Sequence, residues 1–382
     1  MQTYMLSNIF ACRGIFFIVA FYTGLWTIRI PDIKDQINTD YLGIGYIFFS
    51  FALGSIMIML MANSIIKKYS SKKVIKYAGF GQAFTWLAVP LINNLMFFLI
   101  LAFLVGIFYG IFEVSMNLQA SNIEKQKNKS MMSNFHAYFS IGLLTGSIFT
   151  SLMVQIQLSL LFNIILVVLF MLPLTIIFSD LLDKDLSSSS DNSKKNIFFI
   201  WPLSIFILVI FTLTDSFTEG SVDAWAALYM RDVILVKGFQ IGSATIAFNL
   251  FMVIGRLIGD KIRDLIGTYY LLIILFLLSL IGLTIVVTQS SLFSSIIGFS
   301  IIGLGVSIIV PLAYSIAGKI KEVDSAVGIS IISISAYGVF MIAPAILGLT
   351  ADIFGLEMVF LPIIFLFIIC FVLLIFNKKN IY

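Results

Sequence analysis

Acidic residues inside long apolar segments are the first candidates for chemistry in this sequence. Glu113 lies about 17 residues into an apolar stretch over 96–123, which is near mid-depth for a membrane helix rising roughly 1.5 Å per residue. Asn117 follows one turn later and projects from the same face. Because a charge inside a bilayer is costly, Glu113 is a candidate proton-binding group and Asn117 a candidate solute contact. A structural hydrogen bond between helices is the alternative role for Glu113.

Three further acids, Asp215, Glu219 and Asp223, are spaced four residues apart in an apolar stretch over 197–228. Successive steps of four rotate by about 40°, so the three carboxyls form one stripe about 80° wide. Lipid does not tolerate such a stripe, which must face water or basic partners. Close like charges disfavour simultaneous ionisation, which favours a bound proton. Asp215 and Glu219 are therefore candidate proton-coupling groups, and Asp223 is either a solute contact or an interfacial residue.

Aromatic and basic residues near the ends of apolar segments are candidate solute contacts. Trp26 and Arg29 lie near the outer end of the first segment, where Arg29 either holds a solute or snorkels to the interface. Trp225 lies beyond the acidic stripe, as a gate or a solute contact. Tyr314 follows Pro311 in the tenth segment, where the proline predicts a kink.

The composition requires a bilayer around these residues. Of 382 residues, 60% are hydrophobic and 11% are charged, with a mean hydropathy of +1.09 and a net charge of +4. A soluble domain carries roughly 25% charged residues. The sequence has no phosphate-binding G-x-x-x-x-G-K-[ST] motif, and one His with two separated Cys does not make a typical zinc site. We therefore expect no enzyme, cofactor, metal or nucleic-acid partner.

Hydropathy predicts an all-α integral membrane protein with twelve transmembrane helices, since each crossing needs about 20 apolar residues. The expected spans are 6–30, 43–66, 74–92, 96–123, 131–154, 157–178, 197–228, 240–262, 268–288, 292–318, 325–347 and 356–377. A Ser-rich charged stretch separates the two sets of six. The predicted domains are an N-terminal half over 1–179, a cytoplasmic linker over 180–196 and a C-terminal half over 197–382.

Lys and Arg alternate between successive connections. They are frequent around 67–76, 125–129, 261–263 and 319–321, and absent from 93–95, 155–157 and 289–291. The positive-inside rule then predicts an inner-membrane protein with both termini and the linker in the cytoplasm.

The two halves also share spaced small and aromatic residues. Gly106 and Gly303 are 197 residues apart (303 − 106), and Trp26 and Trp225 are 199 apart (225 − 26). With matching spans around a central linker, these pairs predict two six-helix pseudo-repeats.

Several stretches resemble one transporter family. The segment GIFYGIFEVSMNLQASNIEKQKNKSMMSNFHAYFSIGLLTG over 106–146 is similar to the fourth and fifth helices of the fucose-permease-like branch of the major facilitator superfamily. The segments GLWTIRIPDIKDQI (24–37) and EGSVDAWAALYMRD (219–232) are similar to its first and seventh helices. The resemblance implies that helices one, four, seven and ten line a central cavity.

Two departures from that family limit what the resemblance implies. Fucose permeases carry an acid late in the first helix, where this chain has Thr27. The loop signature G-x-x-x-D-R-x-G-R-R is degenerate at 62–73 but has a partial echo in GRLIGDKIRDLIG (255–267). That echo implies an inner gate formed by Arg256 and Asp260.

The combined expectation is a monomeric, proton-coupled secondary active transporter that moves a small polar solute, a sugar or sugar-like metabolite, by alternating access. Proton-driven export of a metabolite, siderophore or drug is the first alternative. A non-transporting membrane sensor is the second, although it has no use for intramembrane carboxyls.

Overall fold

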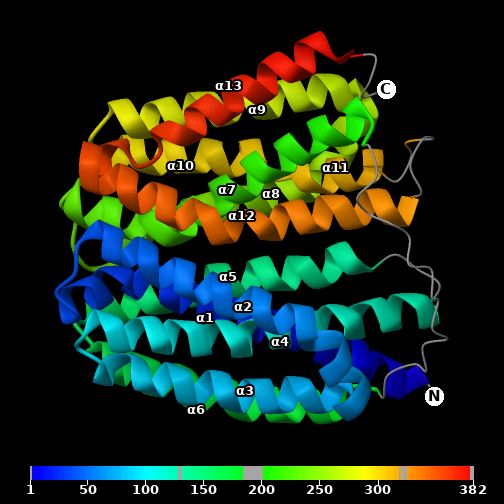
Figure 1. Ribbon diagram of the computed structural model, residues 1–382, viewed down its shortest axis with the longest axis vertical. Coiled ribbons are helices and arrows are strands. Elements are labelled where there is room, and N and C mark those ends of the chain that lie inside the picture. The colour runs from blue at the N-terminus through cyan, green and yellow to red at the C-terminus, as the bar shows by residue number, and fades with distance from the viewer. Residues whose placement is uncertain (1, 128–130, 184–200, 318–319, 321–324, 379–382) are drawn as a thin grey trace. The chain divides into compact units, whose positions relative to one another are not determined.

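The computed structural model describes residues 2–127, 131–183, 201–317, 320 and 325–378. These residues form helices joined by short connections (Figure 1). The chain divides into two compact units, one with α1 to α6 and the short helix η2, the other with α7 to α13. Of the predicted linker over 180–196, residues 184–196 lie outside the described part of the chain, and α6 continues to Leu181.

The first unit contains six long helices. They are α1 Gln2–Gln36, α2 Tyr41–Tyr69, α3 Ser71–Ala88, α4 Leu95–Lys127, α5 Met132–Gln155 and α6 Leu160–Leu181. The 3-10 turn η1 Val89–Leu91 extends α3, and η2 Gly238–Gly242 packs on α5. Within this unit α1 packs on α5 and α6, and α4 packs on α2 and α3.

The second unit contains seven helices in the described residues. They are α7 Leu203–Asp232, α8 Ser243–Ile266, α9 Thr268–Thr288, α10 Leu292–Val306, α11 Ile309–Ala317, α12 Ser325–Phe354 and α13 Leu361–Phe376, with η3 Leu356–Met358 before the last. The predicted tenth span thus consists of two helices, and the predicted kink is confirmed.

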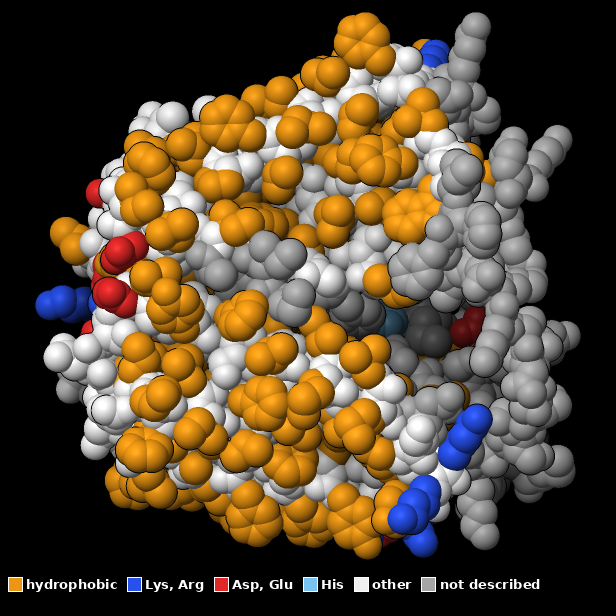
Figure 2. Space-filling model, in the orientation of Figure 1, with side chains coloured by type: hydrophobic (Ala, Val, Ile, Leu, Met, Phe, Trp, Pro, Cys, Tyr) orange, Lys and Arg blue, Asp and Glu red, His pale blue; other side chains and the backbone are white. Residues whose placement is uncertain are grey.

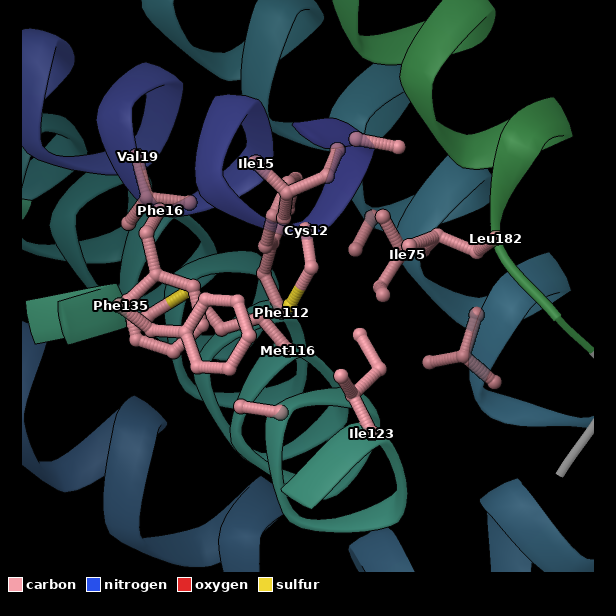
Figure 3. Close-up of a cluster of buried hydrophobic side chains, with 14 of the residues drawn as sticks. Cys12, Ile15, Phe16, Val19, Ile75, Phe112, Met116, Ile123, Phe135 and Leu182 are labelled. Carbon is pink, nitrogen blue, oxygen red and sulfur yellow. The ribbon is translucent and has the colours of Figure 1, made fainter. Parts of the chain in front are cut away.

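A cluster of buried hydrophobic side chains lies in the first unit. Cys12 and Phe16 of α1, Ile75 of α3, Phe112 of α4 and Phe135 of α5 are all buried there (Figure 3). The rings of Phe16 and Phe135 stack with centroids 5.8 Å apart. Because these side chains come from four helices, the core fixes how α1, α4 and α5 present their polar residues.

The outer surface suits lipid. Large exposed hydrophobic side chains cover most of the face shown in Figure 2, and charged side chains lie mainly near its edges. Ten helical segments in the described residues are long and apolar enough to cross a membrane. The other two predicted spans fall on α3 and α12, so the count of twelve stays a prediction.

The two units repeat one close helix contact. A Cβ on Gly106 would lie 2.0 Å from the Phe51 carbonyl oxygen, and one on Gly303 would lie 2.3 Å from that of Phe248. Both glycines and both carbonyls are related by the same shift of 197 residues (303 − 106 and 248 − 51). The α2–α4 and α8–α10 crossings therefore have the same register.

Candidate functional site

The acidic stripe predicted on the seventh span lies on α7. Asp215 is buried with 1% of its surface exposed, whereas the side chain of Glu219 is 28% exposed and Asp223 is half-buried. The stripe therefore runs from a fully buried carboxyl, Asp215, to two partly exposed ones, Glu219 and Asp223.

Glu219 forms an ion pair with a residue of the next helix. The Nη2 of Arg256 on α8 lies 3.0 Å from its Oε1, and the Arg256 side chain is 33% exposed. Charges inside a membrane-spanning region are tolerated where they pair or meet water, and these two side chains pair with each other. Arg256 thus supplies the basic partner that the stripe requires.

Arg256 also bonds to the backbone at the break between α10 and α11. Its Nε donates to the Ser307 carbonyl oxygen at 3.1 Å. Pro311 lies four residues after Ser307 and has no N–H, so the helical donor for that carbonyl is missing. The guanidinium replaces it, and one side chain links the acid on α7 to the kink.

Asp215 is one turn before Glu219, and its Oδ1 has no hydrogen-bond partner in the described residues. The charges of Glu219 and Arg256 both act on this carboxyl. Beside it, the Cys370 thiol of α13 donates to the Thr214 hydroxyl at 3.2 Å. A buried carboxylate oxygen without a hydrogen-bond donor is costly. Asp215 therefore remains the deeper of the candidate proton-binding groups on this helix.

In the first unit, Glu113 and Asn117 lie on α4 as predicted. Glu113 is 9% exposed, and the Asn117 amide donates to the Glu113 backbone carbonyl at 3.0 Å. This bond directs the side-chain N–H of Asn117 to the backbone of α4. The side-chain oxygen of Asn117 can still accept a hydrogen bond. The pair is thus a second polar site in the membrane-spanning region.

Trp26 belongs to an aromatic cluster in the same unit. Its ring meets Phe48 of α2 and Trp86 of α3 edge to face, both at 5.8 Å, and Tyr22 stacks on Trp86 at 5.7 Å. The Trp86 indole N–H and the Gln82 side-chain oxygen are buried without partners in the described residues. Sequence reasoning missed both, because each is an isolated polar atom in an apolar helix.

Arg29 is fully engaged in structural contacts. Its Nε donates to the Asn163 side chain at 2.9 Å, Nη1 to Asp32 at 2.6 Å, and Nη2 to the Leu158 carbonyl at 2.7 Å. The side chain is 4% exposed. Arg29 therefore joins α1 to the start of α6, and neither a solute nor the membrane interface is needed to explain its charge.

The remaining predicted residues lie on α7, α8 and α11 of the second unit. Trp225 is fully buried on α7, and Tyr314 is half-buried on α11. The side chain of Asp260 lies outside the described part of the chain. Arg256 bonds to Glu219 and to the Ser307 carbonyl, and its predicted pairing with Asp260 stays a prediction.

Comparison with known proteins agrees with this architecture. The Major Facilitator Superfamily model matches residues 12–233 and 196–380. An MFS-type transporter of Yersinia pestis is 27% identical over 356 residues, covering 93% of this chain and 92% of its own. Membrane protein MosC of Rhizobium meliloti is 27% identical over 355 residues, covering 91% and 85%.

Solved structures share the fold at low sequence identity. A mutant of the nucleoside transporter NupG has a TM-score of 0.77 at 10% identity, covering 97% of this chain and 99% of its own. A bacterial homologue of the human lysosomal transporter Spinster, inward-facing and occupied, has a TM-score of 0.72 at 11% identity, covering 97% and 96%. Since the family model matches most of its length, this chain belongs to the Major Facilitator Superfamily, a family of multi-pass membrane transporters and not of enzymes.

Proposed function

We propose that this chain is a proton-coupled secondary active transporter for a small polar solute, a sugar or sugar-like metabolite, working by alternating access. The observation that carries the proposal is the contact set of Arg256, which binds Glu219 and the Ser307 carbonyl together. A proton on Glu219 would weaken its hold on Arg256. The guanidinium could then shift toward Asp215, and its hydrogen bond to the Ser307 carbonyl at the break between α10 and α11 would change.

This coupling needs a group that stays charged and a group that changes charge. Arg256 supplies the permanent charge, since a guanidinium keeps its proton at any physiological pH. Glu219 is partly exposed, so protons can reach it, and Asp215 lies one turn deeper. Glu113, buried on α4, is the corresponding proton-binding group that we propose in the first unit.

For the membrane topology, we propose that α3 and α12 also cross, giving twelve spans in two six-helix repeats with both termini cytoplasmic. The shared shift of 197 residues at Gly106 and Gly303 supports a duplication. In the first unit, Asn8 near the start of α1 binds Asp183 after α6, so these two segments lie at the same end. An even number of crossings between them agrees with that placement. The motifs over 24–37, 106–146 and 219–232 support the fucose-permease-like branch.

The test uses purified protein in vesicles with an imposed pH gradient. Labelled hexoses, cyclitols, nucleosides and organic acids are offered, and accumulation is compared with solute-for-solute exchange. The Glu219→Gln variant is expected to keep exchange and to lose at least tenfold of the gradient-driven accumulation. Asp264→Asn is the matched control, because Asp264 pairs with Arg263 in an exposed position at the end of α8.

If Glu219→Gln accumulates the solute as well as the wild type does, Glu219 is not needed for the coupling step. The same result with Glu113→Gln and Asp215→Asn would refute proton coupling altogether. Accumulation that is unaffected by a proton ionophore would refute it in the wild-type protein as well.

A further inference from the structure

The turn between α2 and α3 carries the densest positive charge in the sequence. From Tyr41 to Phe112 the chain has no Asp or Glu, and its five basic residues all lie within ten positions. They are Lys67, Lys68, Lys72, Lys73 and Lys76. The helices meet directly at Ser70, whose positive φ of 70° reverses the chain without a loop. The five ammonium groups are therefore crowded around one corner of the first unit.

The structure separates these lysines into two sets. Lys72 donates to the backbone carbonyls of Asp180 and Leu182 at 2.7 and 2.9 Å, and Lys76 pairs with the Asp180 carboxylate at 2.8 Å. This inward set fastens the end of α6 to α3. Asp180 therefore neutralises one charge and also orders the second lysine.

The outward set, Lys67, Lys68 and Lys73, is exposed, and no acid lies within ion-pair distance in the described residues. The Lys68 ammonium lies 5.1 Å from the ring centre of Tyr69. Tyr69 and Tyr77 are themselves 50% and 66% exposed. Exposed tyrosines next to lysines at the end of a membrane-crossing helix are typical of the bilayer interface.

We propose that Lys67, Lys68 and Lys73 bind the headgroups of anionic phospholipids at the α2–α3 turn. Three like charges that have no counter-ion among the described residues match the phosphodiester of phosphatidylglycerol or cardiolipin. The flanking tyrosine rings lie where the acyl chains meet the headgroups. The proposal involves none of the acids on α4 and α7 and does not depend on proton coupling.

Thermal unfolding in mixed micelles tests the proposal, with dioleoyl phosphatidylglycerol compared with dioleoyl phosphatidylcholine. A bound lipid raises the apparent Tm as its concentration rises. Each lysine near an anionic surface contributes about fivefold in affinity, so the Lys67→Gln/Lys68→Gln/Lys73→Gln variant should bind on the order of 100-fold more weakly. Soluble glycerol 3-phosphate should not reproduce the effect, since it lacks the acyl chains.

The matched control is Lys72→Gln/Lys76→Gln, which removes charge from the same turn. It should lower the basal Tm, because the contacts to α6 are lost, and keep the wild-type response to phosphatidylglycerol. If the triple variant does not fold, Lys73→Gln alone should show about fivefold weaker binding. An unchanged response in the outward variants, an equal loss in the control, or a full response to glycerol 3-phosphate would each overturn the proposal.

Discussion

The Nε of Arg256 lies 3.1 Å from the Ser307 carbonyl oxygen, at the point where α10 ends and α11 has not begun. That carbonyl has lost its helical donor to Pro311, four residues later. An ionisable network and a break in a membrane-spanning helix therefore share one side chain. In the coupling that we propose, a change in the charge of Glu219 would reach the backbone between α10 and α11 through this one guanidinium.

Restoring a backbone N–H at position 311 should remove the link between the helix break and the Arg256–Glu219 ion pair. In Pro311→Ala, the new N–H competes with Arg256 for the Ser307 carbonyl. We expect an apparent Tm equal to or above that of the wild type and a transport rate reduced at least fivefold, because a straight helix resists bending. Thermal unfolding and initial uptake rates in vesicles measure the two effects.

Pro173 is the control for this substitution, since it is also inside a helix, in α6. Pro173→Ala should leave Arg256 and its contacts unchanged. Equal transport rates for Pro311→Ala and the wild type would show that the kink does not limit the cycle.

The sequence left two roles open for Arg29, a solute contact and an interfacial residue. Its removal distinguishes a solute contact from a structural role. Arg29→Met leaves the Asn163 oxygen and the Leu158 carbonyl without their donor inside the first unit. We expect a loss of roughly 2–4 kcal/mol of stability, since each buried group left unsatisfied costs about 1–3 kcal/mol. The KM for the solute should stay within twofold of wild type in the protein that folds.

Arg13→Met provides the comparison, because Arg13 makes an exposed hydrogen bond to Asn134 and lies over the Tyr138 ring. It should cost less than about 1 kcal/mol. A raised KM at normal stability in Arg29→Met would return Arg29 to the solute site.

The sequence predicted the helices well because a bilayer leaves the backbone few alternatives. Hydropathy placed α1 and α4, and the proline at 311 predicted the kink. Tertiary partners were harder to predict. The gate predicted between Arg256 and Asp260 stays a prediction, while the contact of Arg256 with Glu219, 37 residues earlier in the chain, was not predicted. A long flexible side chain selects its partner by helix packing, which local spacing does not encode.

Burial was equally hard to predict for single polar residues. Arg29 bonds to Asn163, 134 residues away, and no periodicity in either segment indicates that contact. The face of α7 that carries Asp215 and Glu219 was predictable, because steps of four define a helical stripe without knowledge of the neighbours. Which of the two acids lies deeper was not, since burial depends on α8 and α13.

Because the α2–α4 and α8–α10 crossings are alike, a methyl group added at either crossing should lower the stability of the protein by a similar amount. Gly106→Ala and Gly303→Ala place a methyl group at 2.0 and 2.3 Å from a carbonyl oxygen, well inside van der Waals contact. Backbone must move in both, so we expect each to cost about 1–3 kcal/mol or more. Gly338→Ala is the control, because no atom of the described part of the chain lies within 4 Å of its new Cβ. A large effect in one unit and none in the other would contradict the equivalence of the two crossings.

The predicted topology can be tested with single cysteines, since Cys12 and Cys370 are both buried, at 1% and 0% exposure. The wild-type protein should therefore react little with a membrane-impermeant maleimide and give a low background. Ser290→Cys, exposed between α9 and α10, should be labelled in intact cells, because that connection lacks Lys and Arg. Lys73→Cys, exposed at the α2–α3 turn, should be labelled only after the membrane is opened. The reverse pattern would invert the proposed orientation, and labelling of both positions from outside would contradict the expected number of crossings between them.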